Sequence, residues 1–223
     1  MQQMIKVGLV EDQILFREGI KAILGNWQDI SVVFESADGY SVPGKLEQCA
    51  ELPDVMLVDL SLPSSGHTEY NGRQLTEYLI RVYPAMKVII LSVHDDENFI
   101  NQLIECGAHA YLVKDTDPYE VYDAIVSVFH RGSYINERTL NAIRRNMGKK
   151  HTAKRPLTTI TRREEEVLKL VCQQHTAEEI AQILFLSVKT VNGHRNALLQ
   201  KTGSRNVTGL VLFAIRHHII APV

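Results

Sequence analysis

Short β-branched runs alternate with segments of helical periodicity along residues 4–130, and this alternation limits the fold more than any other feature of the chain. Five apolar runs have the length and composition of buried strands, at residues 5–10, 30–34, 55–58, 88–91 and 110–113. Helical spacing lies between them, as at Phe16, Ile20 and Ile23. This order predicts an α/β fold with a doubly wound, five-stranded parallel sheet and helices on both faces.

Other helices of this first module are indicated by local signals. Apolar residues repeat the helical spacing in two segments, at Leu75, Leu79 and Val82 and at Ile100, Leu103 and Ile104. Asp117 followed by Pro118 is typical of an N-cap with proline at the first helical position. We expect the last helix of the module to begin there and to continue through Val128.

Polar residues stand at the carboxyl ends of the predicted strands, the edge where parallel sheets of this kind carry their functional groups. They are Glu11, Asp12, Asp59, Ser92 and Lys114. Three crowded carboxylates call for a cation, and oxygen ligands without nearby His or Cys favour Mg²⁺ over zinc or copper. A carboxylate beside Mg²⁺ and a lysine can attack a phosphoryl group, with Ser92 as a donor to a phosphate oxygen.

A structural interpretation of these residues also exists, because any doubly wound sheet has polar residues at its strand ends. Each of the five, taken alone, is more often structural than functional. Four strand ends that carry complementary chemistry together favour phosphoryl chemistry at this edge.

Charge is divided unevenly between the two ends of the chain. Of the 24 basic and 26 acidic residues, ten and five fall in residues 151–223, a net charge of +5. The remaining 14 and 21 give residues 1–150 a net charge of −7. An acidic front and a basic back predict two modules with different partners, the second partner being a candidate polyanion.

The three cysteines, Cys49, Cys106 and Cys172, are far apart and form no metal-ligand spacing, so neither a disulfide framework nor a zinc site is expected. The start of the chain lacks the pattern of a signal peptide, and no apolar run approaches the roughly 18 residues of a membrane span. We therefore expect a cytoplasmic protein without a membrane partner.

Four short helices are predicted in the tail. Thr161 with Glu164 and Thr176 with Glu179 are capping boxes, and Ser187 is the expected cap of a third helix. A fourth helix is expected over 207–217.

The second and third of these helices, joined by a tight turn at 185–187, predict a helix-turn-helix whose second helix enters the major groove. Its exposed face offers Lys189, Thr190, Asn192, His194, Arg195 and Asn196. Small helical units that only contact other proteins are the alternative.

A polar segment separates the modules. Residues 137–147 have the pattern of a short helix, and 148–156 contain no apolar residue beyond one alanine. We therefore expect a first domain at 1–132, a linker at 133–156 and a second domain at 157–223. The basic linker residues are interpreted as solvated chain rather than as a contact to DNA.

The first module resembles the receiver domain of bacterial two-component response regulators, the CheY-like fold. The matching segments are Val10-Glu11-Asp12, residues 57–63, Ile90-Leu91-Ser92 and residues 107–114. The resemblance implies that Asp59 is the phospho-acceptor and that Glu11, Asp12, Asp59 and the backbone carbonyl of Ser61 bind Mg²⁺. It also implies that Ser92 and Lys114 contact the phosphoryl group, and that Tyr111 is a switch aromatic coupled to Ser92. The alternative for Tyr111 is a half-buried strand residue without a switching role.

The sequence departs from the receiver pattern after Pro63. The family's turn glycine usually follows the aspartate by about eight residues, whereas Asn71-Gly72 lies thirteen beyond Asp59, so this loop is about five residues longer. A neutral surface excursion is the default interpretation, because loop insertions cost little free energy. The sharper hypothesis is that His67, Glu69 or Tyr70 folds over Asp59 and alters its dephosphorylation.

The tail is similar to the LuxR-type DNA-binding domain. The matching segments are residues 161–168, 178–184 and 187–194, followed by Lys201-Thr-Gly203 and Arg205. Together the two modules resemble the NarL/FixJ class of response regulators. This resemblance implies DNA contacts by Lys189, Thr190, Asn192, His194 and Arg195, with Lys201 and Arg205 near the backbone. Asn192 and Thr202 depart from the family pattern, which affects sequence preference and packing.

A phosphorylation-controlled transcription factor follows as the expected function, with a sensor histidine kinase, double-stranded promoter DNA and a second copy of the chain as partners. In the resting state the acidic receiver is expected to cover the recognition helix. Phosphorylation is expected to release this helix and to favour a homodimer of the protein. A phosphorylation-independent regulator is one alternative, supported only by the long loop. A Mg²⁺-dependent phosphohydrolase is another, but Ser61 stands where a general acid is needed, so we expect no enzyme.

Overall fold

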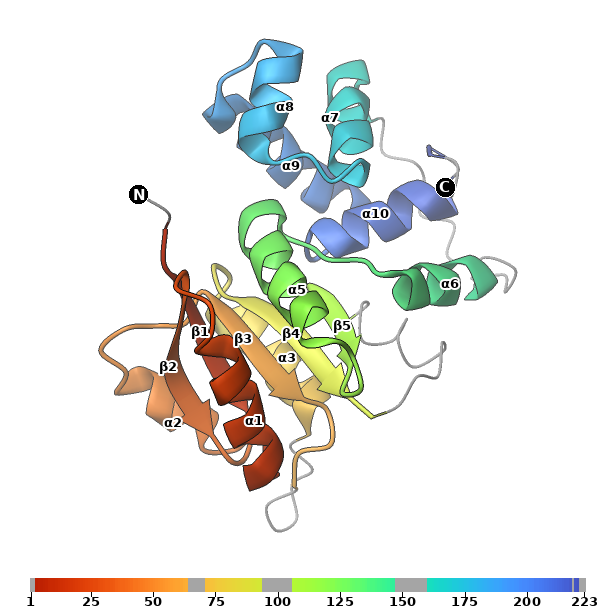
Figure 1. Cartoon of the computed structure of the whole chain (residues 1–223). Coiled ribbons are helices and arrows are strands. Elements are labelled where there is room, and N and C mark those ends of the chain that lie inside the picture. Colours follow the sequence, from red (N-terminus) through yellow and green to blue (C-terminus); the bar gives the residue numbers. More distant parts are fainter. Residues whose placement is uncertain (1–2, 64–70, 94–105, 147–159, 218, 221–223) are drawn as a thin grey trace.

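The computed structural model describes residues 3–63, 71–93, 106–146, 160–217 and 219–220, and within 142–146 only the backbone. Its helices and strands fall into two modules, an α/β module followed by a group of helices (Figure 1). Within the described residues, no helix is long and apolar enough to cross a membrane.

The predicted parallel sheet is present with all five strands. They are β1 (Ile5–Val10), β2 (Ile30–Ser36), β3 (Val55–Asp59), β4 (Lys87–Ser92) and β5 (Ala110–Val113). Every neighbouring pair is parallel, and the strand order is β2-β1-β3-β4-β5. Because β1 lies between β2 and β3 and runs parallel to both, the carboxyl ends of β1 and β3 are adjacent.

Helices cover both faces of the sheet, as expected. They are α1 (Ile14–Leu24), α2 (Val42–Glu47), α3 (Gly72–Val82) and α5 (Pro118–Arg131). Leu57 of β3 shares a core with α1 and α5, whereas its neighbours Met56 and Val58 face α2 and α3. Because a buried cluster covers each face of the sheet, the strands are continuous apolar runs rather than alternating apolar and polar residues. Ile100, Leu103 and Ile104, where another helix was expected, lie outside the described residues.

Helix α5 begins where the sequence predicts. Asp117 accepts a hydrogen bond from the Tyr119 N–H at 2.8 Å, and Pro118 is the first helical residue. The helix is followed by its C-cap Gly132, whose φ of +84° is a left-handed conformation that glycine adopts without a steric penalty.

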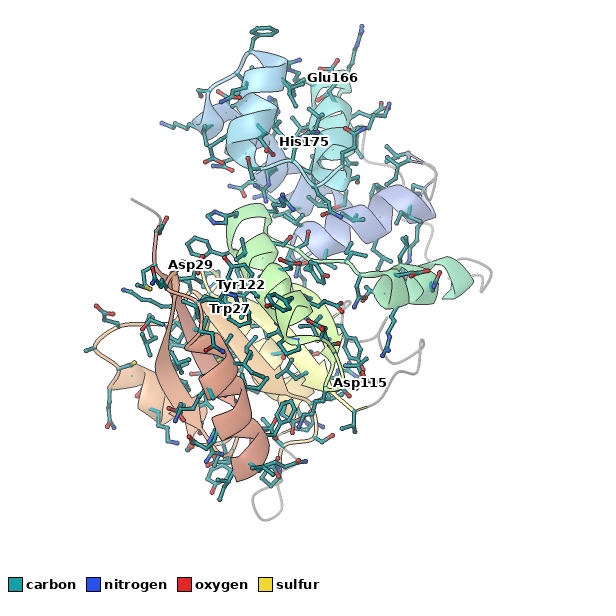
Figure 2. The ribbon with its side chains drawn as sticks, in the orientation of Figure 1. Trp27, Asp29, Asp115, Tyr122, Glu166 and His175 are labelled. Atoms are coloured by element: carbon teal, nitrogen blue, oxygen red, sulfur yellow. The ribbon has the colours of Figure 1, made fainter. Side chains whose placement is uncertain are left out.

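An aromatic contact ties the loop after α1 to α5. Trp27 stacks on Tyr122 with ring centroids 4.8 Å apart, and the Tyr122 hydroxyl donates to Asp29 at 2.8 Å (Figure 2). Trp27 is the single tryptophan of the chain, so its fluorescence reports on the folding of the α/β module.

The second module contains the predicted helices. They are α7 (Arg162–Cys172), α8 (Ala177–Leu184), α9 (Val188–Thr202) and α10 (Val207–Arg216), preceded by α6 (Glu137–Asn146). Both capping boxes form, and Ser187 accepts from the Thr190 N–H at the start of α9. Between α8 and α9, Phe185 adopts a left-handed conformation with φ of 53° and closes the tight turn of the helix-turn-helix.

The two modules are in direct contact through α10 and the segment before β5. Val211, Leu212 and Ile215 of α10 belong to the same buried cluster as Tyr111 and Val113 of β5. Asn206, the N-cap of α10, donates through Nδ2 to the carbonyl oxygens of Gly107 and Ala108, at 2.5 and 3.1 Å. The Thr208 hydroxyl donates to the His109 carbonyl at 2.8 Å. Figure 1 shows α9 and α10 between the receiver-like module and α7 and α8.

His109 lies buried beside this contact as a neutral imidazole. Its Nδ1 accepts a hydrogen bond from the Val88 N–H at 3.1 Å, which requires a neutral ring with its proton on Nε2. Burial, with a smaller contribution from the charge of Lys87, lowers the pKa of His109 to about 3.

The buried imidazole predicts a pH dependence of stability. Because the folded-state pKa lies below the usual 6.5, only the unfolded chain takes up this proton, and stability falls as the pH drops from about 6.5 towards 3. At pH 5 the loss is about 2 kcal/mol. His109→Asn, which keeps an acceptor near Nδ1, should lose that much less between pH 7 and pH 5. Urea unfolding followed by Trp27 fluorescence measures it. The exposed-site control His217→Asn should behave as wild type, and an equal pH dependence in His109→Asn would contradict the prediction.

Candidate functional site

The three acidic side chains predicted at the strand ends lie together. Glu11 follows β1, Asp59 is the last residue of β3, and one carboxylate oxygen from each of Glu11, Asp12 and Asp59 lies within 4.8 Å of the others. Glu11 and Asp59 are buried, whereas Asp12 is partly exposed. The adjacency of β1 and β3 in the sheet brings these residues together.

Lys114 closes the other side of this cluster. Its ammonium group lies 2.8 Å from Glu11 Oε2 and 3.1 Å from Asp59 Oδ2, and it sits 4.6 Å from the ring centre of Phe16. Only 8% of the side chain is exposed. The lysine therefore supplies one positive charge to three carboxylates in a region largely removed from water.

The donor set fits a divalent cation with a preference for oxygen ligands. Glu11 Oε2 and Asp59 Oδ2 are buried and accept no hydrogen bond of normal geometry; their contact in the described structure is the ion pair with Lys114. Burial raises the pKa of Glu11, and the nearby charge of Asp59 adds to the effect. A cation beside these carboxylates would offset the repulsion, and Mg²⁺ suits a site of few carboxylates that is open on the side of Asp12.

Ser61 follows Asp59 at the end of β3, and Ser92 stands at the end of the neighbouring strand β4. The Ser61 N–H donates to Asp59 Oδ1 at 3.1 Å, which orients the carboxylate. Ser92 is the last residue of β4 and is fully buried, and its carbonyl accepts from the Lys114 N–H at 2.7 Å. The backbone thus couples the positions of Ser92 and Lys114.

Tyr111 lies inside the protein rather than half-buried as in the structural alternative. Its side chain is 1% exposed and packs in the cluster that includes Val88, Ile90 and Val211. This cluster contains residues of both modules. A movement of the Tyr111 ring would therefore change the packing of the cluster to which α10 contributes.

Gly72 is a site residue whose importance the sequence only partly indicated. The sequence suggested a turn glycine after the long loop, but Gly72 is the first residue of α3, and Asn71 caps the helix together with Gln74. A Cβ atom on Gly72 would overlap the carbonyl oxygen of Asp59. The helix therefore approaches the backbone of the phospho-acceptor candidate as closely as only glycine permits. The loop residues His67, Glu69 and Tyr70 lie outside the described residues.

The residues expected to contact DNA divide into two groups on α9. Lys189, Thr190 and Asn192, near the start of the helix, are exposed. His194 and Arg195, further along, are partly buried. Arg195 reaches the first module, where its guanidinium donates to the Arg131 carbonyl at 3.3 Å.

Lys201 and Arg205, expected near the DNA backbone, are both engaged within the protein. Lys201 Nζ lies 2.8 and 2.7 Å from the two carboxylate oxygens of the buried Glu164. Arg205 donates to the Cys106 carbonyl at 2.7 Å. The first contact ties α9 to the start of α7, and the second ties the module to the receiver-like sheet; neither partner is indicated by sequence spacing.

Comparison with known proteins matches both modules. Residues 7–126 match the response regulator receiver domain family, and residues 158–214 match the family of bacterial regulatory proteins called the luxR family. The chain is 33% identical to the transcriptional regulatory protein DegU of Brevibacillus brevis, over 96% of this chain and 94% of that protein. It is 34% identical to the uncharacterized transcriptional regulatory protein YxjL of Bacillus subtilis, over 97% of both. A solved structure of the Salmonella typhimurium RcsB response regulator shares the fold, with a TM-score of 0.58 at 22% identity, over 95% of this chain and 97% of that one.

Proposed function

Because this chain belongs to the family of two-component response regulators that join a receiver domain to a LuxR-type DNA-binding domain, we propose that phosphorylation of Asp59 controls its binding to DNA. One observation carries this proposal: Glu11, Asp12, Asp59 and Lys114 meet at the strand ends in the arrangement that phosphoryl transfer to a carboxylate requires. We place the receiver at 1–132, the linker with α6 at 133–156 and the DNA-binding domain at 157–223.

Each pocket residue has a distinct proposed role. Glu11, Asp12, Asp59 and the carbonyl of Ser61 would hold Mg²⁺, which offsets the negative charge of an incoming phosphoryl group. Asp59 is the nucleophile, held by the Ser61 N–H through one carboxylate oxygen. Lys114, now paired with Glu11 and Asp59, contacts a phosphoryl oxygen, and the Ser92 hydroxyl contacts another.

The switch runs from Ser92 to the domain interface. Ser92 and Tyr111 lie on the neighbouring strands β4 and β5, and Tyr111 shares a buried cluster with α10. Movement of Ser92 towards a phosphoryl oxygen would change the space available to the Tyr111 ring. Tightly packed interiors respond to such a change by adopting a second arrangement rather than by deforming gradually.

The described contact between the modules corresponds to a resting state. The start of α9 presents Lys189, Thr190 and Asn192, but the partly buried Arg195 binds the receiver through the Arg131 carbonyl. While Arg195 donates to the receiver, its guanidinium is not available to a DNA base or phosphate. Phosphorylation would weaken the contact, free α9 and allow two copies to bind a two-fold DNA site, with His194, Lys201 and Arg205 completing the contacts. A sensor histidine kinase supplies the phosphoryl group.

Phosphorylation-dependent DNA binding tests this function. A DNA sequence is first selected in vitro from a random pool with protein treated with Mg²⁺ and acetyl phosphate. Fluorescence anisotropy then compares the affinity of treated and untreated protein for that DNA at one fixed salt concentration. We expect treatment to strengthen binding by about tenfold or more, since allosteric coupling typically changes an affinity by about 5- to 150-fold. Equal affinities, with the phosphoryl group shown to be present, would leave a regulator that does not use the receiver as a switch.

A further inference from the structure

A cavity of about 550 Å³ lies between the two modules, away from the phospho-acceptor pocket. Its receiver side is formed by Lys87 at the start of β4 and by His130 near the end of α5. The opposite side is formed by Asn192 and Arg195 of α9 and by Arg205. Lys87 begins β4 and Ser92 ends it. The cavity and the phospho-acceptor pocket are therefore about 16 Å apart, at opposite ends of the strands.

The lining of this cavity is basic on both sides. Lys87, Arg195 and Arg205 carry positive charge, and His109 and His130 add two imidazoles. None of the described residues that line it is acidic. This contrasts with the receiver as a whole, in which acidic residues outnumber basic ones.

Among the described residues, none at the cavity wall offers a carboxylate to these positive charges. Arg195 and Arg205 donate to the neutral carbonyl groups of Arg131 and Cys106. Burial lowers the pKa of Lys87, and the charge of Arg195 lowers it further. Burial also lowers the pKa of Arg195, and only Glu178, which does not line the cavity, acts against this. Like charges partly removed from water without a counter-ion cost free energy, which a bound anion would recover.

A neutral donor completes the lining. Because His109 Nδ1 accepts from the Val88 N–H, the ring carries its proton on Nε2 and acts as a hydrogen-bond donor. Asn192 contributes a side-chain amide from the recognition helix. Charged and neutral donors around a cavity of this size match the usual dimensions of a small-ligand site, about 300 to 1,000 Å³.

We propose that this cavity binds a small anion of the pyrophosphate class, a free diphosphate or the diphosphate group of a nucleotide. The anion bridges Lys87 of the receiver to Arg195 and Arg205 of the DNA-binding domain through charge-assisted hydrogen bonds. It therefore stabilises the contact between the domains and competes with DNA phosphates for Arg195. A cellular diphosphate would act as a second input that opposes release of the recognition helix.

Isothermal titration of the full chain with sodium pyrophosphate, without Mg²⁺ and at constant ionic strength, measures the binding directly. We expect saturable binding of one pyrophosphate per chain. Lys87→Gln should weaken it by about tenfold or more, since it removes one charge from a partly desolvated site, whereas Lys87→Arg should retain most of the affinity. The matched control Lys169→Gln removes a charge from the exposed surface of α7 and should change the affinity less than twofold. Titration with ADP in place of pyrophosphate separates the two sources of the diphosphate group.

Three results would overturn the proposal: no saturable binding, equal binding by wild type and Lys87→Gln, or an equal loss in the Lys169→Gln control. Trp27 fluorescence shows whether the α/β module of each variant is folded, and far-ultraviolet circular dichroism shows whether the helices of the second module are retained. The effect on DNA forms a separate arm that rests on the proposed function. There, pyrophosphate should weaken DNA binding by the unphosphorylated wild type but not by Lys87→Gln. If pyrophosphate binds but does not change the DNA affinity, the anion site is supported and the proposed resting state is contradicted.

Discussion

Asp59→Asn should take up no phosphoryl group when incubated with Mg²⁺ and acetyl phosphate, whereas the wild type gains about 80 Da. Asparagine has nearly the shape of aspartate, but its amide lacks the anionic oxygen that attacks phosphorus. The Ser61 N–H can still donate to the side-chain oxygen, so the pocket should keep its form. Intact-mass spectrometry after a time course measures the gain.

The matched control for this variant is Asp115→Asn. Asp115 is an exposed carboxylate just after Lys114, paired only loosely with Arg138 at 3.4 Å, and it lies outside the acidic cluster. Its replacement should leave phosphorylation at the wild-type rate. A gain of about 80 Da on Asp59→Asn, or its loss from Asp115→Asn alone, would assign the acceptor to another carboxylate.

The same variant also tests the coupling to DNA. Asp59→Asn should bind the selected DNA with the affinity of untreated wild type, whether or not acetyl phosphate is present. If it bound as tightly as phosphorylated wild type at equal protein and salt concentrations, a phosphoryl group on Asp59 would not be the switch. Removal of a negative charge from the pocket would then be sufficient to release the recognition helix.

Local signals in the sequence were sufficient for most of the architecture. The strand predicted at 5–10 and that at 110–113 match β1 and β5, while β2, β3 and β4 extend one or two residues further than predicted. The extensions are polar or charged residues such as Asp59 and Lys87, which hydrophobic patterns exclude although the backbone continues to pair. The caps at Asp117, Thr161, Thr176 and Ser187 were predictable, because a side chain and its backbone partner lie within three residues.

The pocket was predictable for a related reason, and the domain contact was not. In a parallel sheet, residues that end adjacent strands must meet, so Glu11 and Asp59 could be brought together from strand positions alone. Lys114 follows β5, two strands away from β3, and its long side chain reaches both carboxylates from there. The contact between domains depends on side chains that donate to backbone carbonyls about a hundred residues away, as Asn206 does at Gly107. Every residue has a carbonyl, so no pattern of residue types marks that acceptor.

Asn206→Asp should open this contact and strengthen DNA binding by the unphosphorylated protein. The replacement keeps the oxygen that accepts from the Gly209 N–H, so the N-cap of α10 is preserved. It replaces the amide donor by a second anionic oxygen that faces the carbonyl oxygens of Gly107 and Ala108. Two buried hydrogen bonds become repulsive contacts, and each buried group left without a partner costs about 1–3 kcal/mol.

A cost of that size should shift the equilibrium between closed and open forms by about 10- to 100-fold. Because the apparent DNA affinity is proportional to the fraction of protein in the open form, anisotropy with the selected DNA should show a gain that approaches the effect of phosphorylation. Phosphorylated Asn206→Asp and phosphorylated wild type should bind equally, which controls for the added negative charge. Pyrophosphate binding should weaken in the same variant for two reasons: Asn206 lines the cavity, so the aspartate adds a negative charge there, and Lys87 and Arg195 line one cavity only while the domains are in contact. An unphosphorylated Asn206→Asp that binds DNA no better than wild type would show that the contact at Gly107 and Ala108 does not restrain the recognition helix.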